Sequence, residues 1–347
     1  MRPWSTPRWW YTERGGSLVL RIVLTPVSWI WTWATARRIA RATPVDVGCP
    51  VICIGNLTVG GAGKTPVARE VLRRLRERGT LAHGLSRGYG GRLEGPVRVD
   101  PACQDAAEVG DEPLMLAHDG PMWVARDRVA GARAAQAAGA PAVVLDDGHQ
   151  NPNLKKALSL VVVDGETRGG EWPFGDGAAF PAGPMREPFD VGLARADAVV
   201  ILLPADLETP DPRLLALFGH RPVLVARLQP AADPPPGAQL GFAGVAKPWK
   251  VERALKAAGC DLVDFAPFPD HAPYRDADLD FLATRAKALG AGLVTTEKDW
   301  IRLNPAWRAR VAAWPVRARF DDEGALDALL DAALATDPVS SADVSSR

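Results

Sequence analysis

The sequence predicts an α/β protein: a parallel sheet with helices on both faces, a smaller second α/β domain after it, and an amphipathic helix before it. Two observations lead to this fold class. Short apolar, β-branched runs alternate with longer Ala- and Arg-rich stretches, which is typical of parallel strands covered by helices. A Gly-rich segment lies between the first apolar run of the core and the helix that follows it. With 347 residues, the chain is long enough for two domains.

The composition excludes several classes of protein. Lys plus Arg equal Asp plus Glu at 41 each, whereas general nucleic-acid binders carry a basic excess that neutralises phosphates. We therefore expect no nucleic-acid partner. The four cysteines show no paired CxxC spacing, so neither a zinc site nor a disulfide framework is indicated. This cysteine usage fits a reducing, cytoplasmic setting.

The first segment, 1–45, is predicted to form a membrane-associated helix. Residues 17–36 are long and apolar enough to raise the question of a transmembrane span. On a helix, however, the polar residues of this segment form one continuous stripe: Ser17, Arg21, Thr25, Ser28, Thr32, Thr35 and Arg38. Such a helix lies in a membrane interface more readily than it crosses a bilayer.

Aromatic and basic residues support this interfacial position. Six of the twelve tryptophans lie at positions 4, 9, 10, 29, 31 and 33, where their rings suit the headgroup layer. Arginines at 2, 8, 14, 37, 38 and 41 add attraction to anionic lipid. The alternative is a helix that packs only on the protein's own core, with Pro26 as a kink.

The remaining chain divides into a core domain at 46–230, a smaller domain at 231–335 and a polar tail at 336–347 that is predicted to be disordered. The Pro-rich stretch 229–237 marks the seam between the domains. Core strands are expected near 50–55, 81–85, 142–146, 159–164, 197–203 and 222–226, with helices over 65–78 and 124–138. In the smaller domain, strands are expected near 239–243, 262–265 and 292–296, with helices near 248–258 and 276–289.

The Gly-rich loop predicts a P-loop NTPase-like phosphate site. A loop between a strand and a helix N-terminus offers backbone N–H groups and the positive end of the helix dipole to phosphate oxygens. Lys64 can reach the outer phosphates, and the Thr65 hydroxyl can bind Mg²⁺. The predicted nucleotide-binding residues are Thr58, Val59, Gly60, Gly61, Ala62, Gly63, Lys64 and Thr65. The alternative is that this Gly-rich segment is only a tight turn and binds no phosphate.

The loop departs from the usual G-x-x-x-x-G-K-[ST] pattern, because Thr58 occupies the position of the first glycine. The same region argues against two rival classes. Partition-type ATPases carry a second lysine where this chain has Val59, and guanine-specific GTPases have a spacer between Lys and Asp that Lys298-Asp299 lacks. The sequence therefore favours ATP over GTP.

Two adjacent acids follow a predicted strand and indicate a metal site. Asp146 and Asp147 end the run at 142–146 and precede Gly148, where a nucleotide-binding loop needs a carboxylate for Mg²⁺. The alternative is a simple Asp-Gly turn after a strand.

The residues alone do not select the group that accepts the proton of an alcohol substrate. The acidic cluster at 108–113 contains Asp111, although acidic runs are usually solvated surface. The rigid loop at 181–188 carries Arg186 and Glu187, which either clamp an anionic substrate or only turn the chain. His271 either orients a base or has a structural role.

Eight motifs occur in an order that is typical of one family. They are GNLTVGGAGKTP at 55–66, LSRGYGG at 85–91, VGDEP at 109–113, LDDG at 145–148, PAGPMREP at 181–188, FAGVAKP at 242–248, FPDH at 268–271 and TTEKD at 295–299. In these motifs, and over nearly its whole length, the chain resembles the tetraacyldisaccharide 4'-kinases, the lipid A 4'-kinases of Gram-negative bacteria.

The resemblance implies a reaction and a place in the cell. The reaction is transfer of the ATP γ-phosphoryl group, with Mg²⁺, to the 4'-hydroxyl of a tetraacylated glucosamine disaccharide 1-phosphate, giving lipid IVA for lipopolysaccharide. The place is the cytoplasmic face of the inner membrane, with the enzyme peripheral or monotopic. The family also implies a P-loop core domain joined to the smaller α/β domain by a two-stranded hinge.

Family roles carry over to matching positions of this chain. Asp111 becomes the proton acceptor and His271 its partner, while Arg186 and Glu187 line the catalytic cleft. Asp146 and Asp147, with Thr65, serve the metal. The chain departs from the family pattern at His149, Asn151 and Ala272, so no role is assigned to these three side chains.

Two other classes of function share some of these features. A membrane-bound ATPase without a small-molecule acceptor would use the loop and the helix but would not require Asp111. A kinase for a soluble sugar or nucleotide would bury the N-terminal helix in its core.

Overall fold

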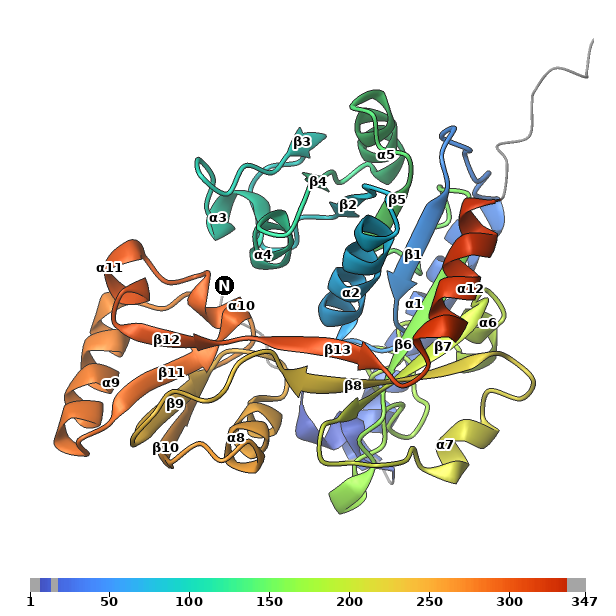
Figure 1. Ribbon diagram of the computed structural model, residues 1–347. Helices are drawn as coiled ribbons and strands as arrows, with labels where there is room; N and C mark the ends of the chain where they lie inside the picture. Colours follow the sequence, from blue (N-terminus) through green and yellow to red (C-terminus); the bar gives the residue numbers. More distant parts are fainter. Residues whose placement is uncertain (1–6, 14–17, 336–347) are drawn as a thin grey trace, which may run out of the picture.

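The computed structural model describes residues 7–13 and 18–335, and its described strands form two sheets. The larger sheet has nine strands within these residues, and the smaller has four (Figure 1). In spatial order the larger sheet contains β13 (Val316–Phe320), β8 (Val223–Pro230), β7 (Ala198–Pro204), β6 (Leu158–Asp164), β1 (Val51–Gly55), β5 (Val143–Asp146), β2 (His83–Ser86), β4 (Met122–Val124) and β3 (Val97–Arg98). We call the part built on it the large-sheet domain.

The larger sheet is mainly parallel, as the alternation of apolar runs and helices predicts. Only its two edge pairs are antiparallel, β13 with β8 and β3 with β4. The central strand β1 lies between β6 and β5, and all five of its residues are buried. Because β1 and β5 are parallel, their carboxyl ends meet at one edge, where Ile54 pairs with Asp146.

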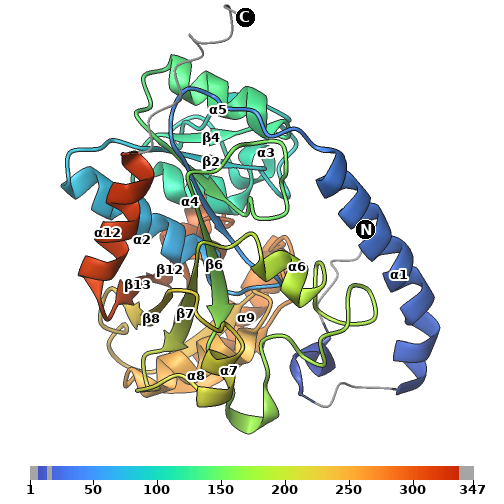
Figure 2. The ribbon, with the colours of Figure 1, turned by 90° about the vertical axis from the view of Figure 1, so that its right-hand side faces the viewer.

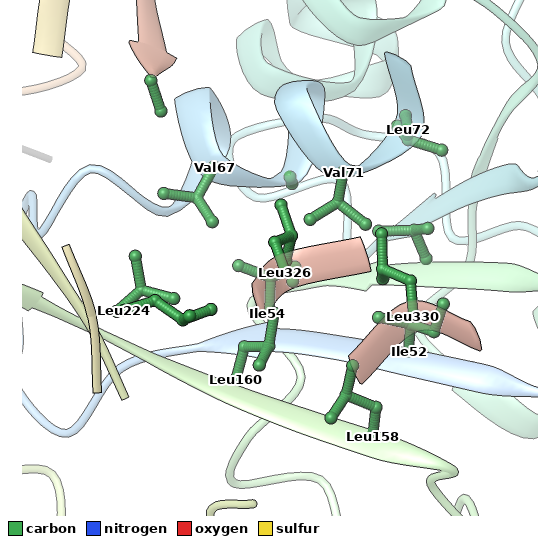
Figure 3. Packing of buried hydrophobic residues seen from close by; sticks show 14 of the residues in the cluster. Ile52, Ile54, Val67, Val71, Leu72, Leu158, Leu160, Leu224, Leu326 and Leu330 are labelled. Atoms are coloured by element: carbon green, nitrogen blue, oxygen red, sulfur yellow. The ribbon is translucent and has the colours of Figure 1, made fainter. Parts of the chain in front are cut away.

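Helices cover both faces of the larger sheet. On one face, α2 (Lys64–Glu77) and α12 (Glu323–Leu334) bury leucine and valine side chains against β1 and β6 (Figure 3). Val67 and Val71, four residues apart on α2, point into this cluster with Leu326 of α12. The other helices of this domain are α3 (Ala106–Val109), α4 (Asp111–Ala117), α5 (Arg128–Ala137), α6 (Phe189–Leu193) and α7 (Pro212–Ala216), and two 3-10 turns cover Arg8–Tyr11 and Arg168–Gly170.

The smaller sheet is fully parallel and follows the order β10 (Leu262–Pro267), β9 (Gln239–Ala243), β11 (Gly292–Thr296), β12 (Val311–Trp314). Its helices are α8 (Pro248–Ala257), α9 (Asp276–Ala288), α10 (Glu297–Trp300) and α11 (Pro305–Arg308). We call this part the small-sheet domain. It contains the strands and helices that the sequence predicts for the second domain.

The last strand and helix return to the larger sheet. β13 pairs with β8, so the chain passes between the sheets twice, from β8 to β9 and from β12 to β13 (Figure 1). On α12, Asp327 accepts hydrogen bonds from Arg74 of α2 at 2.8 and 2.7 Å. The predicted small domain, 231–335, therefore needs correction at its C-terminal end, because 316–334 belongs to the large-sheet domain.

The N-terminal helix α1 (Leu18–Arg41) lies along one side of the large-sheet domain (Figure 2). Its polar stripe faces the protein. The Ser28 hydroxyl is buried, donates to the Ala179 carbonyl at 2.9 Å and accepts from the Ala182 N–H at 3.1 Å. Arg21 pairs with Asp176 at 2.9 Å.

The opposite face of α1 is apolar and exposed. Its exposed large side chains are Val19, Leu20, Ile22, Val23, Val27, Trp29, Ile30 and Trp33, whereas the partly exposed Trp31 donates to the Arg186 carbonyl at 3.0 Å and packs against Phe180. Within the described ranges, no helix is long and apolar enough to span a membrane. Of the residues that the sequence assigns to the interface, Arg2, Trp4, Arg14 and Ser17 lie outside the described residues, as does the tail at 336–347.

Candidate active site

The Gly-rich loop connects β1 to α2, as predicted, and the helix begins at Lys64. Gly60 and Gly63 adopt positive φ angles of 100° and 80°, a region that other L-residues rarely occupy. A Cβ atom on Gly63 would also lie 2.2 Å from Cδ2 of Leu202. The second half of the loop therefore requires glycine, and it leads into a fourteen-residue helix whose first N–H groups are available to an anion.

The first half of the loop is held as a strand-like segment, which accounts for the missing glycine at position 58. Thr58 forms an isolated antiparallel bridge with Met185. The Val59 N–H donates to the Pro184 carbonyl at 2.7 Å, and the Tyr11 hydroxyl donates to the Val59 carbonyl at 2.6 Å. The loop at 181–188 thus supports the Gly-rich loop directly.

Lys64 extends back across the loop. Its ammonium donates to Oδ1 of Asn56 at 3.3 Å and lies 3.6 Å from Oδ1 of Asp147. The buried Asn56 amide in turn donates to the Thr58 carbonyl at 2.8 Å. Asn56 is a supporting residue that sequence reasoning missed, although it lies inside the quoted motif next to the last residue of β1.

Asp146 is a buried carboxyl group at the end of β5. Only 1% of the residue is exposed, and neither carboxylate oxygen has a hydrogen-bond partner among the described residues. Burial, with the nearby charge of Glu112, raises the pKa of Asp146 to about 7. A buried carboxylate without a partner is unfavourable unless a cation or a proton compensates it.

Asp147 is compensated by cations. It adopts a left-handed conformation with φ of 56°, and its carboxylate accepts from Arg186 at 2.7 Å. Although burial opposes ionisation, Lys64 and Arg186 hold the pKa of Asp147 well below its usual range. The two neighbouring acids therefore differ in their surroundings: cations pair with Asp147, whereas Asp146 has no partner among the described residues and is the one left free to bind a cation.

A magnesium ion bound together with nucleotide phosphates fits this arrangement. In the described part of the chain, no group of three or more His, Cys, Asp and Glu side chains is placed to hold a metal alone. Mg²⁺ in nucleotide sites is usually held by one or two carboxylates, phosphate oxygens and water. The unpartnered Asp146 carboxylate and the buried Thr65 side chain are oxygen donors of the required kind.

Arg186 and Glu187 have different surroundings. The Arg186 guanidinium contacts Asp147 and donates to the Thr58 carbonyl at 2.9 Å, so it faces the Gly-rich loop. Glu187 is buried and accepts two hydrogen bonds from Arg195 at 2.6 Å and one from Gln150 at 3.0 Å. The Glu187 carboxylate is thus satisfied within the large-sheet domain.

Asp111 and His271 come together from the two domains. Asp111 begins α4 of the large-sheet domain, whereas His271 follows β10 in the small-sheet domain. His271 Nδ1 lies 3.1 Å from Asp111 Oδ2. Lys298 and Arg302, both from the small-sheet domain, lie 3.9 and 3.8 Å from the same oxygen.

The electrostatic surroundings keep Asp111 ionised. The residue is only 4% exposed, and burial alone would raise its pKa. The nearby Lys298, His271 and Arg302 outweigh burial and hold the pKa of Asp111 below its usual range. Asp111 is therefore a carboxylate at neutral pH that can accept a proton.

Arg128 is a further buried cation that sequence reasoning missed. Its Nη1 donates to the Ala125 carbonyl at 2.7 Å, while its Nε has no hydrogen-bond partner among the described residues. Burial and the nearby Arg87 lower the pKa of Arg128 to about 10. Nothing in its local sequence separates it from other arginines, since Asp127 simply caps α5 before it.

The three positions that depart from the family pattern have ordinary structural surroundings. His149 is buried between the Ser159 hydroxyl and the Gly192 carbonyl, and burial lowers its pKa to about 4. Asn151 accepts from the Asn153 N–H at 2.9 Å in a turn. Ala272 is buried, and its carbonyl accepts from Arg302 at 3.1 Å.

Comparisons with a family profile and with curated proteins point to the same family. A profile of the family described as tetraacyldisaccharide-1-P 4'-kinase matches residues 20–335. The tetraacyldisaccharide 4'-kinase of Caulobacter sp. (strain K31) is 69% identical over 328 residues, which cover 94% of this chain and 98% of that protein. The enzyme of the same name from Phenylobacterium zucineum (strain HLK1) is 68% identical, with the same two coverages.

A solved structure has the same fold. The crystal structure of LpxK from Aquifex aeolicus in complex with ATP superposes with a TM-score of 0.71. The two chains are 24% identical, and the match covers 91% of this chain and 99% of that one. The likeness shows the α/β fold with its large, mainly parallel sheet.

Proposed function

The chain belongs to the tetraacyldisaccharide-1-P 4'-kinase family, and we propose on this basis that it phosphorylates the 4'-hydroxyl of a tetraacylated disaccharide 1-phosphate in lipid A biosynthesis. The phosphoryl donor is ATP, which the related structure from Aquifex aeolicus binds. One observation of the structure carries the assignment to this site: the ionised Asp111 carboxylate meets His271 between the two domains, 3.1 Å apart.

The reaction requires a proton acceptor beside the attacking hydroxyl. The 4'-oxygen forms a bond to the γ-phosphorus, the bond from that phosphorus to the bridging β–γ oxygen breaks, and ADP leaves. The hydroxyl proton passes to Asp111. A carboxylate with a lowered pKa is a weak base, but phosphoryl transfer goes through a loose transition state in which positioning and charge compensation supply most of the rate.

The nucleotide half of the site consists of residues 58–65 and the cations around them. The N–H groups of the loop and of the first turn of α2 bind phosphate oxygens, and Lys64 binds the outer phosphates. Thr65 and Asp146 would hold Mg²⁺, which would supply positive charge to neutralise the phosphates. Arg186 and Lys64 keep Asp147 paired, so Asp147 supports the site and is not the nearer metal ligand.

The exposed apolar face of α1 gives the protein its contact with lipid. The acyl chains of the substrate stay in a bilayer, so the enzyme must present its cleft at the interface. Trp29, Ile30 and Trp33 are 69%, 66% and 61% exposed on the face turned away from the protein, and burying them in the acyl and headgroup boundary is favourable. We place the protein at the cytoplasmic side of the inner membrane.

The experiment is a transfer assay. Purified protein is incubated with ATP, Mg²⁺ and the lipid disaccharide 1-phosphate in detergent, and the lipid is analysed by mass spectrometry. We expect a doubly phosphorylated lipid, with one ADP formed for each. Steady ATP hydrolysis without this product would contradict the proposal and favour an ATPase. Phosphorylation of soluble sugars in place of the lipid would favour a kinase with a soluble acceptor.

A further inference from the structure

Lys298 lies at the centre of the contact between the two domains. It belongs to α10, and its ammonium donates to Oε1 of Glu112 at 2.8 Å. The same ammonium lies 3.3 Å from Nε2 of His271. Lys298 thus contacts the histidine on the ring nitrogen opposite to the one that faces Asp111.

The chemistry of these groups decides where the imidazole carries its proton. A lysine ammonium only donates hydrogen bonds, so the ring nitrogen that it contacts must be an unprotonated acceptor. If Nε2 of His271 accepts from Lys298, the ring proton is on Nδ1. That nitrogen lies 3.1 Å from Oδ2 of Asp111, a buried oxygen to which no other group among the described residues donates, so the N–H points at the carboxylate.

We propose that Lys298 is a positioning residue that fixes the neutral Nδ1–H tautomer of His271, and thereby directs the imidazole N–H at Asp111. This inference deepens the proposed function and rests on Asp111 as the proton acceptor. The Nδ1–H donor fixes the orientation of the Asp111 carboxylate. With the opposite tautomer, an imidazole lone pair would face a carboxylate, and the two groups would repel each other.

Acidic groups lie on both sides of the His271 imidazole. Asp111 from α4 lies on the Nδ1 side, and Asp270 lies 3.8 Å from Nε2. The Lys298 ammonium places a hydrogen-bond donor at Nε2, which matches an imidazole that carries its proton on Nδ1. Tyr89 contacts the ring only through an edge-to-face packing, at 5.2 Å between ring centroids.

Lys298 remains charged in this position. Burial opposes its charge, but Glu112, Asp111 and Asp270 raise its pKa above the usual value. Its backbone is also fixed, because the Thr296 side chain caps α10 and the adjacent Asp299 is fully buried, with hydrogen bonds from the Gly244 N–H and the Tyr274 hydroxyl. Glu112 belongs to the large-sheet domain and His271 to the small-sheet domain. The Lys298 ammonium can therefore contact both residues only where the two domains meet.

The test is nitrogen NMR of the full chain labelled with ¹⁵N-histidine, bound to a non-hydrolysable ATP analogue at neutral pH. The sequence has five histidines, and His271→Gln identifies the signals of His271. In the wild-type protein we expect a protonated Nδ1 and an unprotonated Nε2. In Lys298→Met we expect a proton on Nε2. Lys298→Arg, which keeps a donor-only cation, should retain the wild-type pattern.

Activity provides a second measurement. Lys298→Met should lower kcat by about tenfold to hundredfold, less than most of the roughly 10²–10⁴-fold that a general acid–base group contributes, because Asp111 itself remains. KM for ATP should stay within about twofold. The other four histidines report whether the variant is folded. A wild-type His271 that is protonated on Nε2, or a Lys298→Met spectrum with unchanged His271 nitrogens, would overturn the inference. These NMR outcomes do not depend on whether the lipid is the true acceptor.

Discussion

The imidazole of His271 lies 3.1 Å from the carboxylate of Asp111, although the first residue belongs to the small-sheet domain and the second to the large-sheet domain. Neither domain alone contains the pair. The large-sheet domain supplies the Gly-rich loop and the carboxylate, and the small-sheet domain supplies the histidine and the cations that keep the carboxylate ionised. The contact between the domains therefore completes the site.

Replacing Asp146 should stabilise the metal-free protein while abolishing activity. Its pKa is about 7 in the folded protein and about 3.9 in an unfolded chain. The folded state therefore holds an extra proton between these values, and its stability falls as pH rises through this window. At pH 8, Asp146→Asn should raise the free energy of unfolding by roughly 2 kcal/mol, measured by urea unfolding without metal.

Asp147 is the matched control for this experiment. Its carboxylate pairs with Arg186 and Lys64, and its pKa is lowered. Asp147→Asn removes the partner of two cations and should destabilise the protein at pH 8. A loss of stability in Asp146→Asn at pH 8, similar to that in Asp147→Asn, would contradict the assignment of Asp146 as the unpaired acid.

Glu187 should contribute to stability and not to chemistry. Glu187→Gln weakens a buried ion pair with Arg195, which we expect to cost about 2 kcal/mol of unfolding free energy. The kcat of the folded variant should stay within about threefold of wild type, because Glu187 takes no part in proton transfer. The loss of a proton-transfer group would lower kcat far more. Thermal unfolding and steady-state kinetics measure the two effects. A hundredfold lower kcat with unchanged stability would return Glu187 to the catalytic role that the family resemblance implies.

The exposed face of α1 should bind vesicles. Combining Trp29→Gln with Ile30→Gln removes two apolar side chains that each contribute about 1.5–3 kcal/mol when buried, so vesicle affinity should fall at least about tenfold. Ser28→Ala, on the buried face, is the control and should keep vesicle binding. Co-sedimentation with anionic vesicles measures both. Equal sedimentation of the double variant and the wild-type protein would contradict the orientation of α1.

Much of the fold could be predicted because its signals are local. The segments 239–243 and 292–296 are strands β9 and β11 with the same bounds, since each is a compact apolar run between turns. The strand β4 was missed because it has three residues and directly precedes α5. The predicted helix at 124–138 therefore begins too early, since Asp127 caps α5 and the helix starts at Arg128.

The rest of the fold depends on contacts that are distant in sequence. The strand β13 alternates apolar and basic residues, as a strand with one buried face does. Its partner β8 is adjacent in space, but the whole small-sheet domain separates the two strands in the sequence. The polar stripe of α1 was predicted, whereas the side that it faces was not, because Ser28 is buried only through the loop at 179–182. Lys298 was missed as a site residue for the same reason, because its partners Glu112 and His271 lie far from it in the sequence.

The most direct measurement of the proposed chemistry compares lipid phosphorylation with ATP binding in Asp111→Asn. The variant keeps the size of the side chain but removes the carboxylate that accepts the proton. We predict at least about a hundredfold loss of transfer, with the ATP dissociation constant changed by less than about twofold. An equal loss of transfer and of ATP binding would contradict the proposed role of Asp111.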